Sequence, residues 1–221
     1  MPIVTAKKNI PDSEKTHWQY YLMLENDFLG LLEYCALSTD NYDCYSNRMT
    51  QLLLSICSEV ENVSKLINKR YQVTNLTFFE SLKNIMDREL DNRICEKEIC
   101  EISIESLIGC SPIYPFSGTN YKKGSKSDIK IEWWQDMADL KHDREKYRNN
   151  GNLKNVYNSL SALFFLESLL IKIDSEALAA NDKIAKNLDR PVQDSSIFST
   201  ESINYRCNRS PEFTFYPDPQ K

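Results

Sequence analysis

Apolar side chains recur at steps of three and four residues in several stretches of this chain, which is the spacing of amphipathic α-helices. The predicted helices cover residues 18–35, 46–69, 77–91, 132–148 and 152–173. The cleanest stripe belongs to the second of these helices and consists of Met49, Leu52, Leu53, Ile56, Val60, Val63, Leu66 and Ile67. The sequence therefore predicts a mainly α-helical fold, a helical bundle.

The predicted helix at 152–173 is apolar on two sides. A helix of this kind is buried between two layers, either at the centre of a bundle or at a subunit interface. The second alternative predicts a homodimer.

The periodicity changes between the third and fourth predicted helices. Cys100, Ile102 and Ile104 alternate with polar residues, as in a half-buried strand, and Ile129 with Ile131 could form its partner. Prolines, glycines and polar residues fill the interval between them. We expect a small β-hairpin or loop insertion at about 98–131, inside a bundle domain of residues 14–186. Residues 187–221 are polar and irregular, which predicts a C-terminal tail that packs weakly or not at all.

Composition narrows the functional classes. The 221 residues carry 27 basic and 32 acidic side chains, a net charge of −5, so any contact with nucleic acid must be local. No secretory signal and no run of about 18 apolar residues is present, which favours a cytoplasmic protein without membrane contact. Seven cysteines without a regular framework are typical of reduced thiols.

A metal site is not predicted from residue spacing. Cys95 and Cys100 are separated by four residues, an acceptable spacing for zinc ligands. A second close pair is missing, and the two histidines, His17 and His142, are far apart in the sequence. We therefore predict neither a metal nor a cofactor.

Glu59 interrupts the apolar stripe of the helix at 46–69, whereas Glu61 falls on the opposite side. An inward carboxylate is costly unless it is protonated, paired with a cation or placed at a cleft. Two interpretations remain open: a structural ion pair, or a carboxylate that supports a functional site.

The densest polar cluster is Lys141, His142, Asp143 and Arg144. On a helical wheel, His142 lies opposite the apolar stripe of its helix, so it is not a simple core histidine. Histidine is the usual proton shuttle, and neighbouring cations can neutralise a phosphate during RNA cleavage. The alternative is a solvated helix end with local ion pairs.

Two segments carry a resemblance to a known family. The first is Tyr45-Ser46 followed by Leu52-Leu53-Leu54-Ser55-Ile56-Cys57-Ser58-Glu59-Val60-Glu61. The second is Trp133-Trp134, then Leu140-Lys141-His142-Asp143-Arg144, then Asn152-Leu153-Lys154-Asn155-Val156, and the pair Pro115-Phe116 agrees with both. Over about residues 18–173 the chain resembles bacterial helical proteins of the HEPN-like class.

The resemblance implies a helical bundle, often dimeric, that binds RNA or a nucleotide or acts as a metal-independent ribonuclease in a toxin–antitoxin or phage-defence system. Nuclease members carry an arginine four to six positions before the histidine, where this chain has Ala138, Met137 and Asp136. The expected site is therefore a rearranged one, with His142 as acid or base, Lys141 and Arg144 on the phosphate, and Glu59 in support. The other hypothesis is a non-catalytic interaction module or scaffold that binds a partner protein of such a system.

Overall fold

The computed structural model describes residues 14–89, 104–108, 113–116, 130–181 and 195–199. Its α-helices are α1 (Gln19–Leu32), α2 (Asn47–Arg70), α3 (Phe78–Glu89), α5 (Glu132–His142) and α6 (Leu153–Asn181). Three short helical turns lie beside them: η1 (Glu14–Trp18), η2 (Thr39–Asn41) and η4 (Arg148–Asn150). The prediction of a mainly α-helical fold is confirmed.

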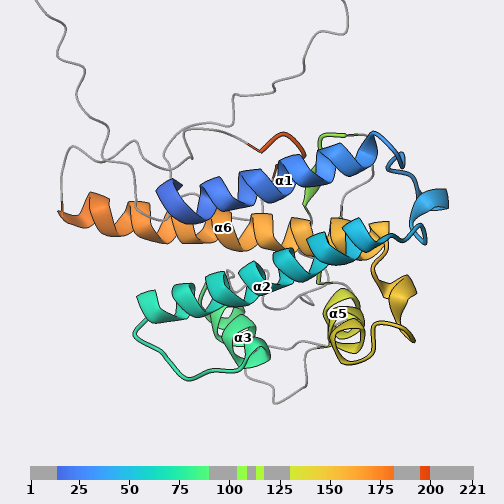
Figure 1. The fold of residues 1–221 in the computed structure, drawn as a ribbon. Coiled ribbons are helices and arrows are strands. Elements are labelled where there is room, and N and C mark those ends of the chain that lie inside the picture. Colours follow the sequence, from blue (N-terminus) through green and yellow to red (C-terminus); the bar gives the residue numbers. More distant parts are fainter. Residues whose placement is uncertain (1–13, 90–103, 109–112, 117–129, 182–194, 200–221) are drawn as a thin grey trace, which may run out of the picture.

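Helix α6 lies in the middle of the bundle (Figure 1). Helix α1 covers one side of α6, and α2 packs along the other. Helices α3 and α5 lie on the far side of α2 from α1. Along the chain, α2 and α6 run in the same direction, and α1 runs opposite to both.

The central position of α6 explains why it is apolar on two sides. Leu153, Leu163 and Leu170 are all at most 1% exposed, and so are Leu166 and Leu169. Residues Leu153–Asp174 are long and apolar enough to cross a membrane, but 83% of that window is buried inside the bundle. Other helices of the same chain cover both apolar sides, so the pattern needs no second subunit, and the homodimer stays a prediction.

Capping residues set the starts of two helices. The Ser46 hydroxyl accepts a hydrogen bond from the Met49 backbone N–H at 3.1 Å and caps α2. Before α3, the Glu80 carboxylate accepts from the Thr77 backbone N–H at 2.8 Å, which is the return half of a capping box. Both starts agree with the sequence prediction.

The predicted helix at 132–148 is wrong beyond His142, because α5 ends there. Asp143 has φ −147° and ψ 88°, and its carboxylate accepts a hydrogen bond from the Lys146 backbone N–H. A short polar side chain that binds nearby backbone in this way competes with helix continuation. Arg144 therefore lies in a turn rather than on the apolar stripe of a helix.

The structure tests the strand prediction only at the end of the first predicted strand, and the predicted partner is wrong. Strand β1 (Glu105–Ser106) pairs antiparallel with β2 (Phe198–Ser199), and Ile104 bridges to Ile113. The expected partner, Ile131, is instead a buried residue at the start of α5, while Cys100, Ile102 and Ile129 lie outside the described residues.

Residues 195–199 also depart from the expected loose tail. Ile197 and Phe198 are at most 2% exposed, and Ser195 is buried with them. Phe198 packs against Tyr157 and Phe164 of α6, with ring centroids 5.6 and 5.7 Å apart. This short segment is part of the core.

Candidate functional site

A histidine and two glutamates from three separate elements meet inside the bundle. His17 comes from η1, Glu59 from the middle of α2 and Glu167 from the middle of α6. Each offers a nitrogen or carboxylate oxygen, and these atoms all lie within 4.8 Å of one another. The inward position predicted for Glu59 is confirmed, because its side chain is only 12% exposed.

Glu59 has partners in this cluster. The nitrogen Nδ1 of His17 lies 2.8 Å from Glu59 Oε1, and the Asn62 amide donates to Oε2 at 3.3 Å. A pairing of Glu59 with Lys141, His142 or Arg144 would favour the scaffold hypothesis. In the structure its partner from another element is instead the His17 imidazole.

Glu167 is the exception in the cluster. Its side chain is 0% exposed, and neither carboxylate oxygen has a hydrogen-bond partner among the described residues. Burial raises the pKa of this carboxyl well above its usual value, and the negative charge of Glu59 adds to the effect. A buried polar group without a partner costs free energy, so its retention calls for an explanation.

An open hollow of about 730 Å³ adjoins this cluster. Most of its lining residues are polar, and most come from α2: Asn47, Thr50, Gln51, Leu54, Ser55, Ser58 and Glu59. Tyr20 of α1 and Arg144, from the turn after α5, complete it. Within the described part of the chain, Arg144 forms neither an ion pair nor a hydrogen bond, so its guanidinium is available to a ligand.

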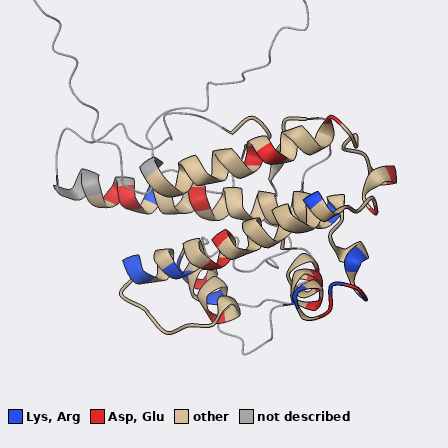
Figure 2. Cartoon of the chain, viewed as in Figure 1, with Lys and Arg blue, Asp and Glu red and all other residues tan. Residues whose placement is uncertain are grey.

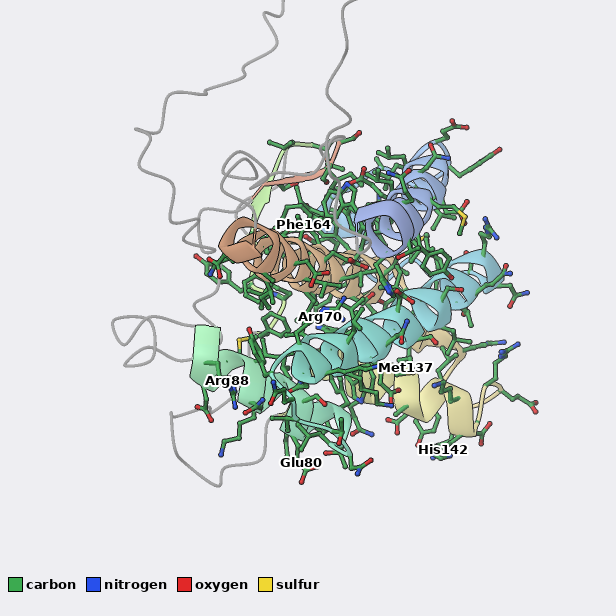
Figure 3. All side chains as sticks on the ribbon, turned by 90° about the vertical axis from the view of Figure 1, so that its left-hand side faces the viewer. Arg70, Glu80, Arg88, Met137, His142 and Phe164 are labelled. Carbon is green, nitrogen blue, oxygen red and sulfur yellow. The ribbon has the colours of Figure 1, made fainter. Side chains whose placement is uncertain are left out.

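The residues of the predicted polar cluster 141–144 do not all face the hollow. Arg144 lines the hollow together with Glu59, whereas Lys141 and His142 do not line it. His142 is exposed at the outer end of α5, away from α1 and α6 (Figure 3). Lys141 acts on α2 electrostatically, since its charge opposes the rise in pKa that burial causes in the Cys57 thiol. The structure thus joins two of the four predicted site residues at one surface.

Charge around the hollow is mixed. Acidic and basic positions alternate at the end of α5 and in the turn that follows it (Figure 2). Alternating charge of this kind is typical of a solvated surface, which is the alternative interpretation of residues 141–144.

A second buried carboxylate, Glu25 of α1, is fully hydrogen-bonded. Its Oε1 accepts from the Tyr21 hydroxyl at 2.7 Å and from the Ser195 hydroxyl, and its Oε2 accepts from the Ser196 backbone N–H at 3.0 Å. Ser195 Oγ in turn accepts from the backbone N–H groups of Ile197 and Phe198. This network has a structural role, because it fixes residues 195–198 on α1.

Sequence reasoning missed His17 and Glu167 as members of the cluster. The signal for Glu167 is the same as for Glu59, a carboxylate that interrupts an apolar helix. Two such interruptions on helices that pack together point to a shared polar site. His17 precedes its helix and gives no periodic signal.

No family model, curated protein or solved structure significantly matches this chain. The functional argument therefore depends on the geometry of the hollow and of the cluster beside it.

Proposed function

We propose that this protein binds RNA or a nucleotide in the hollow between α2 and Arg144. The observation that carries the proposal is the composition of the lining. It combines the Arg144 guanidinium, which has no partner among the described residues, with an aromatic ring and several neutral hydrogen-bonding groups on one open surface.

Each of these groups suits one part of a nucleotide. Arginine binds phosphate through two parallel N–H groups, which makes Arg144 the phosphate ligand. Tyr20, at the rim and 36% exposed, offers a ring on which a base can stack. The amides of Asn47 and Gln51 and the hydroxyl of Ser55 can bind sugar or base edges.

Cleavage of RNA is the further step of this proposal. His142 has the exposure that a proton shuttle needs, and Lys141 adds positive charge beside it. The resemblance to the HEPN-like class supports a metal-independent ribonuclease of a toxin–antitoxin or phage-defence system, in the cytoplasm.

A binding measurement tests the proposal. Fluorescence anisotropy with a labelled single-stranded RNA, in EDTA, should show saturable binding that Arg144→Ala weakens about tenfold, the effect of one charged hydrogen bond. The salt dependence of log K should become shallower by about 0.7, because one phosphate contact is lost. Arg148→Ala is the matched control, since Arg148, the first residue of η4, is an exposed arginine four positions from Arg144 that does not line the hollow.

The second candidate function is a non-catalytic interaction module that binds a partner protein. It is favoured by large apolar side chains at the surface along α1, where Met23 is 52% exposed and Tyr34, just after the helix, is 90% exposed. A folded protein that binds neither RNA nor nucleotide in the anisotropy measurement would favour this candidate over the first.

A further inference from the structure

We propose that His17, Glu59 and Glu167 form a binding site for a divalent transition-metal ion. The three side chains supply one imidazole nitrogen and two carboxylates, which are ordinary ligands of such ions. They come from η1, α2 and α6, three elements that pack together, so the fold itself holds them in place.

The spacing of the ligand atoms fits a single ion. Neighbouring ligands around an octahedral ion with bonds of about 2.1 Å lie about 3 Å apart, and opposite ligands about 4.2 Å apart. In the cluster, His17 Nδ1 lies 2.8 Å from Glu59 Oε1, and all three ligand atoms lie within 4.8 Å of one another. Small side-chain rotations therefore close the cluster around an ion. His17 then binds as the tautomer that carries its proton on Nε2.

The bare Glu167 carboxylate is an independent indication. It is completely buried, and among the described residues nothing donates a hydrogen bond to either of its oxygens. A second carboxylate, Glu59, lies beside it and adds negative charge. A divalent cation cancels the charge of two carboxylates and supplies the missing partner, whereas a neutral histidine does neither for Glu167.

The donor set also selects among metals. Calcium and magnesium prefer oxygen ligands throughout, while an imidazole nitrogen suits iron or zinc and the two carboxylates also suit manganese. Glu59 lines the open hollow as well as the cluster, so an ion can enter from solvent. Three protein ligands leave coordination positions open, and we place these on the side of the hollow.

This inference does not depend on the binding of RNA or a nucleotide. The ion is held by three protein side chains, and its binding is measured in the absence of any other ligand. Failure of one proposal leaves the other standing.

The test is a titration of the full chain with Mn²⁺ after metal has been removed with EDTA and the chelator exchanged away. Free Mn²⁺ is followed by electron paramagnetic resonance. The wild type should bind one equivalent, Zn²⁺ should displace it, and Mg²⁺ at the same concentration should not. Glu167→Gln and His17→Ala should each weaken Mn²⁺ binding at least tenfold.

Glu61→Gln is the matched control. Glu61 lies two positions from Glu59 on the same helix, but it is at the surface and pairs with Lys65, so this variant should bind Mn²⁺ like the wild type. Glu167→Gln keeps the shape of the side chain and replaces the buried carboxyl by a neutral amide, so it should remain folded, which circular dichroism checks. A wild type without saturable Mn²⁺ binding, or a folded Glu167→Gln protein with undiminished affinity, overturns the proposal.

Discussion

Thr50 and Gly151 approach so closely that a Cβ atom on Gly151 would stand 2.0 Å from Thr50 Oγ1 and 3.0 Å from its Cβ. The two residues join the beginning of α2 to the chain that leads into α6. The Ser46 backbone N–H donates to the Gly151 carbonyl at 3.3 Å and strengthens the same junction. Thr50 also lines the hollow, so this contact sets one of its walls.

Gly151→Ala should therefore destabilise the protein by about 1 to 3 kcal/mol, the usual cost of overpacking a filled site. Denaturation with urea measures this change. Thr50→Ala in the same chain removes the closest atom and should recover part of the loss. Gly30→Ala is the control, because nothing lies within 4 Å of a Cβ on Gly30 and the change should be neutral or stabilising. A Gly151→Ala protein as stable as the wild type would show that the neighbouring atoms can move to accommodate the added methyl group.

Ser195→Ala should cost about 1 to 3 kcal/mol, because it removes one hydrogen bond to the buried Glu25 carboxylate and takes the side-chain acceptor away from two backbone N–H groups. Thermal or chemical unfolding measures the loss. Ser196→Ala is the matched control, since Ser196 binds Glu25 through its backbone and its side chain is exposed. Equal stability of the two variants would contradict the role assigned to the Ser195 hydroxyl.

The free energy of unfolding of the wild type should fall as the pH rises above 10. The cause is the Tyr21 phenol, which ionises more readily in the unfolded chain than in the folded protein. Burial, reinforced by the Glu25 charge, raises the pKa of this phenol well above 10 in the folded state. Above pH 10 the unfolded chain loses this proton first, which favours unfolding by up to about 1.4 kcal/mol per pH unit. Tyr21→Phe should lack this contribution. Between pH 8 and 11, the free energy of unfolding measured in urea should therefore fall more for the wild type than for the variant. A difference independent of pH would refute the prediction.

The Cys57 thiol should resist alkylation in the folded protein. It is 1% exposed, and burial raises its pKa, so little thiolate is present at pH 8. Cys44 is exposed and should react with iodoacetamide much faster. Peptide mapping by mass spectrometry compares the two sites directly, and unfolding in urea should abolish the difference. Comparable labelling of both thiols before unfolding would mean that α2 opens readily.

His142→Ala should reduce RNA cleavage by about 100- to 10,000-fold if His142 transfers the proton. Because the side chain is exposed, the free energy of unfolding should change by less than about 0.5 kcal/mol. Both quantities are measured on the same purified variant. A wild type that cleaves no RNA, even over long incubation, would remove the catalytic part of the proposed function.

The sequence predicts the helices well wherever local pattern decides the structure. The apolar stripe of α2 and the capping residues Ser46 and Thr77 are local signals, and the structure confirms both. The end of α5 was missed, because the side chain of Asp143 competes with the helix at a position where the apolar period continues.

Local sequence patterns do not predict contacts between residues that are far apart in the sequence. Strand β1 pairs with residues more than 90 positions away, and His17 meets Glu59 across 42 positions. Neither partner has a local signature. For the candidate site, the sequence identified Glu59 and Arg144, and the pairing of Glu59 with Glu167 required the packing of α2 on α6 to be known.

The bonds from Glu25 to Ser195 and Ser196 have a consequence for the order in which the chain can fold during synthesis. Helix α1 is synthesised before residues 195 and 196, and the Glu25 carboxylate meets these partners only after about 170 further residues, roughly 10 to 30 s at ordinary translation rates. Until then Glu25 lacks these two hydrogen bonds. We therefore expect the face of α1 that carries Glu25 to reach its final packing only after residues 195–198 have been made.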